Sequence, residues 1–269
     1  MATGHDLAAL TGNPDQTSDL SGRYSISGSG VSPQTLTANG TLDLEPGYVG
    51  QRDLDGADLA FSLTRGALAL DGTLDLPEGS LAFNVTGRPF DENPSFALGE
   101  QTCFSNLDLG RLGDVPDFYT DLNGCFRGSI TGFDPETADG SGVVTLRPST
   151  INASEVTEGE ITLALNDGSI NAALDLTFAA TASAVEGEEP QPGRFIAAFE
   201  GDLFIEEPTY ALTGRAEGLD VNAILPQAPT QPLFLTADFN VTGRGTDPLT
   251  AIVEGEIVAE PSAVGFAKI

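Results

Sequence analysis

The sequence predicts an all-β fold built from an elongated, repetitive antiparallel sheet, with one short helix in each repeat. Two observations support this fold class. Apolar and polar residues alternate along many short segments, and the chain resembles itself at an offset of 102 residues. The 32 glycines and 17 prolines are typical of short strands that are joined by frequent turns.

The alternation is clearest on the two sides of two predicted hairpin turns. Apolar residues occupy most alternate positions in 59–76 around Arg65-Gly66, and again in 161–178 around Asn166-Asp167-Gly168. A period of two is typical of half-buried antiparallel strands, and a glycine-containing turn between two such runs indicates a hairpin. Further strands are expected at 80–85, 94–98, 194–199 and 208–214.

The internal repeat explains much of the remaining pattern. "DLAALTGNPDQTSDLSG" at 6–22 lies over "DLGRLGDVPDFYTDLNG" at 108–124 without a gap. Further matches at the same offset are Gly30 with Gly132, Pro33 with Pro135, Thr35 with Thr137, Gly40 with Gly142 and Pro46 with Pro148. Such self-similarity indicates that one structural unit recurs along the chain.

A third, partial copy begins near Leu219 at an offset of 113, and an acidic insert at 182–193 explains the longer spacing. Its matching residues are Gly245, Pro248, Thr250, Gly255 and Pro261. We therefore predict repeat 1 at 1–106, repeat 2 at 107–218 and a partial repeat 3 at 219–269. Short helices with aspartate N-caps are expected at the start of each repeat, in 6–10, 108–112 and 220–225.

The charge is strongly acidic, with 40 Asp and Glu against 11 Lys and Arg and a formal net charge of -29. Such a field repels phosphate groups, so nucleic acid is not an expected partner. Calcium binding and a halophilic surface are both compatible with this composition. The halophilic interpretation is favoured because the acids are spread along the whole chain and the single lysine is Lys268.

Neither catalysis nor a cofactor is predicted. His5 is the single histidine, and no phosphate-binding glycine loop of the Walker type is present. Asp53, Asp55 and Asp58 in "DLDGAD" form a weak candidate for a calcium loop. A solvated acidic turn is favoured there, because the twelve-residue spacing of an EF-hand and its terminal glutamate are lacking.

The two cysteines, Cys103 and Cys125, bracket the short helix expected in 108–112. Cys103 ends one expected strand and Cys125 begins the next, so pairing across neighbouring strands is sterically feasible. In an oxidising compartment, closure of a loop of this size would add about 3 kcal/mol of stability. A disulfide and two buried free thiols both remain open.

Residues 104–142, "FSNLDLGRLGDVPDFYTDLNGCFRGSITGFDPETADGSG", resemble the repeat unit of the TamB and AsmA-like proteins of diderm bacteria. In that family an "NLDL..LL" helix is followed by "TDLNG.....G.G.DP..L.G", and residues 218–257 are similar to the same unit. The resemblance implies a sheet curled into a groove, a β-taco, in a parent protein that is anchored in the inner membrane and crosses the periplasm. Its role would be to shield phospholipid acyl chains between the inner and outer membranes and to assist outer-membrane assembly, with an outer-membrane barrel as a further partner. Neither the N-terminal anchor nor the C-terminal domain of the family is recognised, so a middle fragment is expected.

In this interpretation one apolar face lines the groove. The expected lining residues are Tyr24, Ile26, Leu42, Leu44, Phe61, Leu63, Leu68, Leu70, Leu74, Leu76, Phe83, Val85, Phe96, Leu98, Phe126, Ile130, Val144, Leu146, Leu163, Leu165, Leu174, Leu176, Phe178 and Phe239. The alternative is an acidic structural or adhesive surface protein with closed cores, which calcium could rigidify. Alternation does not separate an open face from a closed one, and by itself it favours a buried core.

Overall fold

The computed structural model describes residues 2–5, 17–32, 35–50, 52–180, 191–224, 233–245, 251–260, 263–264 and 267–268. The chain is nearly all antiparallel β, with 70% of residues in strands and 3% in helices, which confirms the predicted fold class. It divides into two compact units. The N-terminal unit comprises Met1–Leu107 and Cys125–Ser129, and the C-terminal unit comprises Asp108–Gly124 and Ile130–Ile269.

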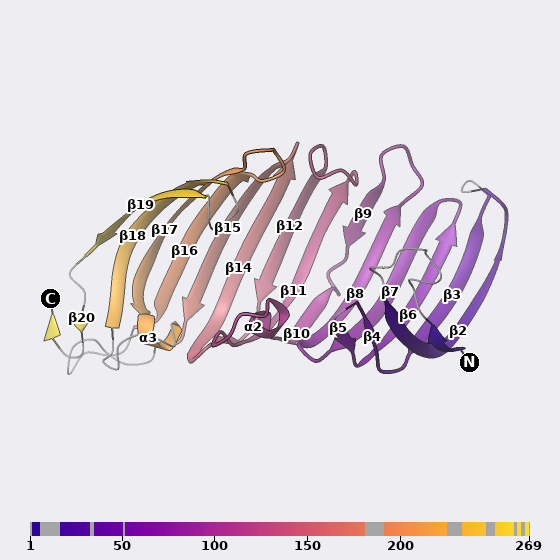
Figure 1. Cartoon of the computed structure of the whole chain (residues 1–269), viewed down its shortest axis with the longest axis horizontal. Coiled ribbons are helices and arrows are strands. Elements are labelled where there is room, and N and C mark those ends of the chain that lie inside the picture. Colours follow the sequence, from indigo (N-terminus) through magenta and orange to yellow (C-terminus); the bar gives the residue numbers. More distant parts are fainter. Residues whose placement is uncertain are drawn as a thin grey trace. The chain divides into compact units, whose positions relative to one another are not determined.

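The N-terminal unit contains ten complete strands among its described residues (Figure 1). They are β1 (Ala2–His5), β2 (Ser18–Ser29), β3 (Thr37–Leu44), β4 (Gly47–Val49), β5 (Arg52–Leu54), β6 (Gly56–Thr64), β7 (Ala67–Leu76), β8 (Gly79–Arg88), β9 (Ser95–Leu98) and β10 (Cys103–Leu107). The main sheet runs β1–β2–β3–β6–β7–β8, and both β9 and β10 pair with the remaining edge of β8. The short strand β4 pairs with β5 and with the first two residues of β2.

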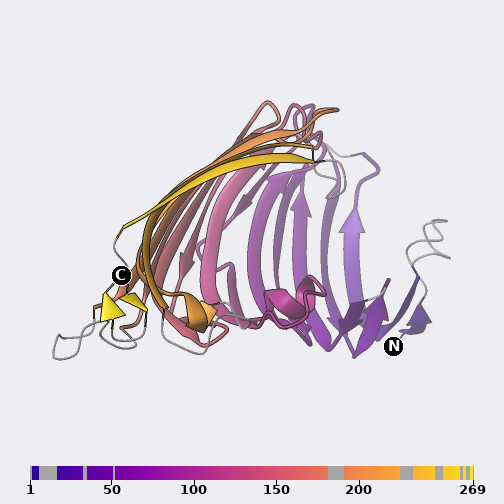
Figure 2. The same cartoon turned by 60° about the vertical axis from the view of Figure 1, so that its left-hand side comes forward.

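In the C-terminal unit the main sheet runs β12–β14–β15–β16–β17–β18–β19. The elements that follow β10 are α2 (Leu109–Leu112), β11 (Thr120–Thr131), β12 (Asp139–Leu146), β13 (Ser149–Ile151), β14 (Ser154–Asn166), β15 (Ser169–Phe178), β16 (Gly193–Asp202), β17 (Thr209–Asp220), α3 (Val221–Ile224), β18 (Leu233–Arg244), β19 (Ile252–Ala259), β20 (Ala263–Val264) and β21 (Ala267–Lys268). Strand β11 contributes residues to both units. Strands β14 to β18 bow along their length, so the sheet of this unit is curved (Figure 2).

The sequence repeat recurs as a repeat of strand lengths. Strands β2, β11 and β18 each have 12 residues, and the strands that follow them, β3, β12 and β19, each have 8. Directly after the 12-residue strands lie Gly30, Gly132 and Gly245, with φ angles of 95°, 90° and 81°. Glycine adopts this left-handed conformation without the steric cost of a side chain, which explains why it recurs at these positions.

The two predicted hairpin turns are present. Arg65 and Gly66 have φ angles of 50° and 83°, and Asp167 and Gly168 have φ angles of 45° and 81°. Two consecutive residues with positive φ match the right-handed twist of the flanking strands. Each turn joins two strands in direct register, β6 with β7 and β14 with β15.

The short helix α2 begins at a buried aspartate, as the sequence predicts. The Asp108 carboxylate oxygen Oδ1 accepts hydrogen bonds from the backbone N–H groups of Gly110 at 3.0 Å, Arg111 at 3.3 Å and Thr120 at 3.3 Å. It therefore caps the helix and also fixes the start of β11. Helix α3 confirms the expectation for 220–225, whereas the helix expected at 6–10 lies outside the described residues. Within the described ranges, no helix is long and apolar enough to cross a membrane.

The buried core that alternation alone favours is not what the structure has. Among the described residues, twelve hydrophobic side chains are buried, and five of them are alanines. A second packed layer would bury most of the leucines and phenylalanines of one face. Most of these side chains are instead half-buried in the sheet of each unit. A period of two shows that one face is apolar, but it carries no information about whether another layer covers that face.

Candidate functional site

The pairing register gathers the apolar residues of the N-terminal unit on one side of its sheet. Directly opposed residues of antiparallel strands point to the same face. One such row runs from Tyr24 through Leu42, Leu59 and Gly72 to Phe83. The predicted positions on this face are Tyr24, Ile26, Leu42, Leu44, Phe61, Leu63, Leu68, Leu70, Leu74, Leu76, Phe83, Val85, Phe96 and Leu98. We call this set, together with Leu59 and Leu81, the N-terminal apolar face.

The C-terminal unit has an equivalent face. A row of directly opposed residues runs from Leu163 through Ala172, Phe199 and Leu212 to Val241. The predicted positions on this face are Val144, Leu146, Leu163, Leu165, Leu174, Leu176, Phe178 and Phe239. The register also places Ile161 and Ile170 of the predicted hairpin on this face. It adds residues that sequence reasoning missed: Phe195, Phe199, Tyr210, Leu212 and Val241. We call the whole set the C-terminal apolar face.

The missed residues on β16 and β17 lie in segments for which strands were expected. Their face was not assigned, because the acidic insert at 182–193 separates them from the preceding hairpin and hides the register. Residues 182–190 of that insert lie outside the described residues. The alternation of Phe195, Ala197 and Phe199 is the signal that could have placed β16.

Phe126 and Ile130 lie four residues apart on β11, and hence on the same side of that strand. Phe126 belongs to the N-terminal unit and is half-buried. Its backbone N–H donates to the Thr102 carbonyl oxygen at 2.7 Å. Ile130 belongs to the C-terminal unit and is exposed.

Within each apolar face the side chains are packed side by side, but neither face has a covering layer in the part of the chain that the structure describes. On β16, Ala197 of the apolar face exposes 6% of its surface, whereas the next residue, Ala198 on the opposite face, is exposed. Ala197 is covered by larger neighbours on its own face, such as the directly opposed Leu174. Tyr24 and Ile26, by contrast, each expose 64% of their surface. Large apolar side chains therefore shield small ones and remain accessible themselves.

Aromatic rings on these faces lie over glycines of the neighbouring strand. Phe83 is directly opposed to Gly72, and a methyl group added there would lie 3.1 Å from the Phe83 Cζ atom. The same arrangement joins Phe61 with Gly40, Phe96 with Gly87, Phe239 with Gly214 and Tyr210 with Gly243. A ring that lies along a neighbouring backbone covers it without projecting far from the sheet. The pairs therefore give a smooth apolar surface and stabilise the strand pairing.

The opposite face of the C-terminal sheet carries acids that are held by arginines. Arg194 donates to Asp175 through Nε at 3.0 Å and Nη2 at 2.6 Å, and this hydrogen bonding lowers the pKa of the Asp175 carboxyl. Arg215 donates to three carboxylates on this face, and their hydrogen bonds raise the pKa of its guanidinium. These are Glu217 at 2.8 Å, Asp238 at 2.9 Å and Glu260 at 2.7 Å. Charge is thus concentrated on the side away from the apolar residues.

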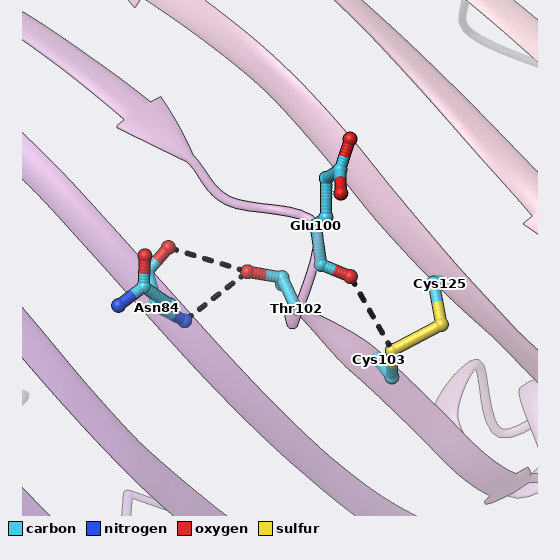
Figure 3. The surroundings of a disulfide bond; sticks show 5 residues. All are labelled: Asn84, Glu100, Thr102, Cys103 and Cys125. Atoms are coloured by element: carbon cyan, nitrogen blue, oxygen red, sulfur yellow. Dashed lines mark hydrogen bonds between the residues drawn. A yellow bond between two sulfur atoms is a disulfide. The ribbon is translucent and has the colours of Figure 1, made fainter.

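Figure 3 shows the disulfide between Cys103 and Cys125, which the structure has in place of two free thiols. Cys103 is directly opposed to Ala82, so it lies on the face opposite the N-terminal apolar face. Beside it, the Asn84 N–H donates to Thr102 Oγ1 at 3.2 Å, and that hydroxyl donates to the Asn84 carbonyl oxygen at 3.3 Å. The disulfide therefore ties β10 to β11 within the N-terminal unit and does not line an apolar face.

The weak metal candidate gains no support from the geometry. Asp53, Asp55 and Asp58 are exposed, and Asp58 is directly opposed to Asp43 and Thr73 on the polar face. In the described ranges, no three acidic, histidine or cysteine side chains form a group that could hold a metal ion.

No protein-family model, curated protein or solved structure matches this chain. The two apolar faces are therefore the features from which a function is inferred.

Proposed function

We propose that this chain is a segment of a periplasm-spanning envelope protein of a diderm bacterium. Its apolar faces would line a groove that shields lipid acyl chains while phospholipids move between the inner and outer membranes. The observation that carries this proposal is that each described sheet has a broad apolar face without a covering layer. Large uncovered apolar surfaces on a protein mark sites that bind apolar partners.

The chemistry of the faces suits an acyl chain. Each CH₂ group that leaves water for an apolar surface gains about 0.8 kcal/mol. The residues that form the faces are mainly Leu, Phe, Ile and Val, with glycines beneath the aromatic rings. A surface of this kind holds tails without selecting one lipid, which suits transfer better than storage.

The distribution of charge supports the same proposal. The net charge of -29 and the carboxylates of the opposite face disfavour contact with anionic head groups on that side. Acyl chains would then associate with the apolar side alone. The resemblance to the TamB and AsmA-like repeat supports the periplasmic location, an outer-membrane barrel as a further partner and a part in outer-membrane assembly.

A matched pair of variants tests the proposal on β15. Ala172 lies on the C-terminal apolar face between Leu163 and Phe199, and Ala173 lies on the opposite face. Ala172→Asp places a carboxylate where acyl chains would bind, so the affinity for a fluorescent fatty acid should fall about tenfold, equivalent to about 1.4 kcal/mol. Ala173→Asp adds the same charge to the same strand and should leave the affinity unchanged.

Organic extraction and mass spectrometry of the purified protein provide the second measurement. We expect co-purified phospholipid or fatty acid. Absence of lipid together with no fatty-acid binding would overturn the proposal. If the melting temperature then rose strongly in millimolar calcium, the adhesive alternative would be supported instead.

A further inference from the structure

One end of the N-terminal sheet has no carboxylate on its strands, namely the end at which β2 joins β3, β6 joins β7 and β8 joins β9. The pairing register aligns the segments 26–29, 37–40, 61–64, 67–70, 85–88 and 95–98 there. In a chain with 40 Asp and Glu, these segments contain none and include one arginine, Arg88. We call these segments, together with the Arg65-Gly66 turn, the carboxylate-free end.

The second repeat carries carboxylates at equivalent positions of its own sheet. The offset of 102 residues gives three of the pairs, and the register gives two more, because Gly87 faces Leu68 as Gly201 faces the equivalent Ile170. The pairs, first repeat before second, are Ser32 and Asp134, Thr37 and Asp139, Arg65 and Asp167, Thr86 and Glu200, and Arg88 and Asp202. Two arginines and three hydroxyl residues thus replace five carboxylates. Both repeats have the same strand pairing here, so the fold does not dictate the difference.

Arg65 is the residue on which an anion would bind. Its side chain is exposed and forms no ion pair with a described residue. Its φ angle is 50°, and that of the equivalent Asp167 is 45°. Aspartate and asparagine adopt this left-handed conformation more readily than arginine does. Turn geometry therefore does not account for an arginine at this position, whereas a role for its guanidinium would.

Hydroxyl groups lie beside this turn. The Arg65 backbone N–H donates to the Leu36 carbonyl oxygen at 2.9 Å, so the turn adjoins the connection between β2 and β3. In that connection the hydroxyl oxygens of Ser32 and Thr35 lie 3.0 Å apart. Guanidinium and hydroxyl groups both donate hydrogen bonds to phosphate oxygens. The turn and its neighbours therefore supply the donors that a phosphate group needs.

Arg88 adds a second positive charge at the same end. It pairs with Asp91 at 3.8 Å, and both side chains are about half exposed, so the ion pair is weak. Asp91 and Glu92 lie in the turn after β8 and are the acids that balance the two arginines. The carboxylate-free end and this turn are thus neutral together, although the whole chain carries a formal charge of -29.

We infer that the carboxylate-free end binds the phosphate of phospholipids whose acyl chains lie on the N-terminal apolar face, with Arg65 as its main contact. This inference rests on the proposed function. The apolar and polar faces meet at the strand ends, so a head group there would remain in water while its tail contacts Leu68 and Phe96. The negative field of the rest of the chain disfavours a phosphate elsewhere, which directs it to this end.

Two lipids with the same acyl chain test the inference by calorimetric titration of the full chain. Lysophosphatidic acid carries a phosphate, and monoacylglycerol does not. Arg65→Asp introduces the residue that the second repeat has in this turn. It should lower the affinity for lysophosphatidic acid about tenfold and leave that for monoacylglycerol unchanged. Arg65→Lys keeps the charge and should retain most of the affinity.

Arg52→Asp is the matched control, because it changes the net charge equally but lies in β5, outside this end. At about 0.15 M salt, where charges beyond about 8 Å are screened, it should leave both affinities unchanged. Circular dichroism should show all variants folded. Equal losses for the two lipids in Arg65→Asp, or an equal loss in Arg52→Asp, would overturn the inference.

Glycerol 3-phosphate, the head group without a tail, separates a lipid site from a site for a soluble phosphate. It should bind far more weakly than lysophosphatidic acid, and equal affinity would contradict the assignment to lipids. If monoacylglycerol binds and Arg65→Asp leaves lysophosphatidic acid binding unchanged, the inference fails and the proposed function stands. If neither lipid binds the wild type, both fail.

Discussion

The disulfide allows the stability of the N-terminal unit to be changed without changing either apolar face. Replacing Cys103 and Cys125 together by serine removes the cross-link and leaves no free thiol. The two residues are separated by 22 positions. Loop-closure entropy for a loop of this length gives about 3 kcal/mol of lost stability at 25 °C. Serine is nearly isosteric with cysteine, so little packing energy should be lost in addition.

The loss should be largest in the N-terminal unit, because both cysteines and their neighbours Thr102 and Asn84 belong to it. The closed loop includes Asp108–Gly124 of the C-terminal unit, so the full loop-closure entropy is released only when that segment unfolds as well. The assay is native-state hydrogen exchange in increasing urea. Amides of β7 and β8 should exchange with a free energy lower by up to about 3 kcal/mol in the variant, and amides of β15 and β16 should be affected less. Reduced wild-type protein is the control and should match the variant.

Three results would refute this reasoning. Equal stability of the variant and the oxidised wild type would show that the loop is already constrained in the unfolded chain. An equal loss in β15 and β16 would show that the two units unfold together. A further loss on adding reductant to the variant would show that the reductant acts through something other than the disulfide.

Three further predictions concern the sheet and its caps. Gly214→Ala should destabilise the C-terminal unit by about 1–3 kcal/mol in chemical unfolding, because the added methyl would overlap both the Ile196 carbonyl oxygen and the Phe239 ring. Gly56→Ala in the N-terminal unit, whose methyl would have its nearest neighbour at 3.4 Å, should destabilise its unit less. An equal loss of stability in the two variants would contradict the close packing inferred at Gly214. Arg194→Gln should raise the pKa of Asp175 toward its ordinary value of 3.8, which a carboxyl NMR titration would measure. In the wild type the ion pair stabilises the fold above that pH, and this stabilisation is lost as the pH falls through the lowered pKa. Asp108→Ala should lower the free energy of unfolding by about 1–2 kcal/mol and speed amide exchange in α2, since three backbone N–H groups lose their acceptor. Unchanged exchange would show that these N–H groups find another acceptor.

The sequence was most informative where backbone geometry dictates residue type. Gly30, Gly132 and Gly245 recur because each ends a strand with positive φ, and the turn at Asp167-Gly168 requires two such residues in succession. These local requirements are independent of packing. The repeat, the strands and the hairpins were therefore predictable.

The covering of the apolar face was not predictable from alternation. Ala197 and Ala198 are adjacent and identical, and their different exposure depends on side chains supplied by neighbouring strands. The state of Cys103 likewise depends on which segment of β11 approaches it. Both features follow from contacts between distant parts of the chain, which a linear pattern does not encode.

The most direct measurement of the central claim is photo-cross-linking with a fatty acid that carries a diazirine in its tail, followed by peptide mass spectrometry. If acyl chains bind the apolar faces, labels should fall on alternate residues of a strand. On β14 they should mark Leu163 and Leu165 and spare Thr162 and Ala164, which lie on the opposite face. Labels spread equally over both sets, or confined to the opposite face, would contradict the assignment of these faces as the lipid-binding surface.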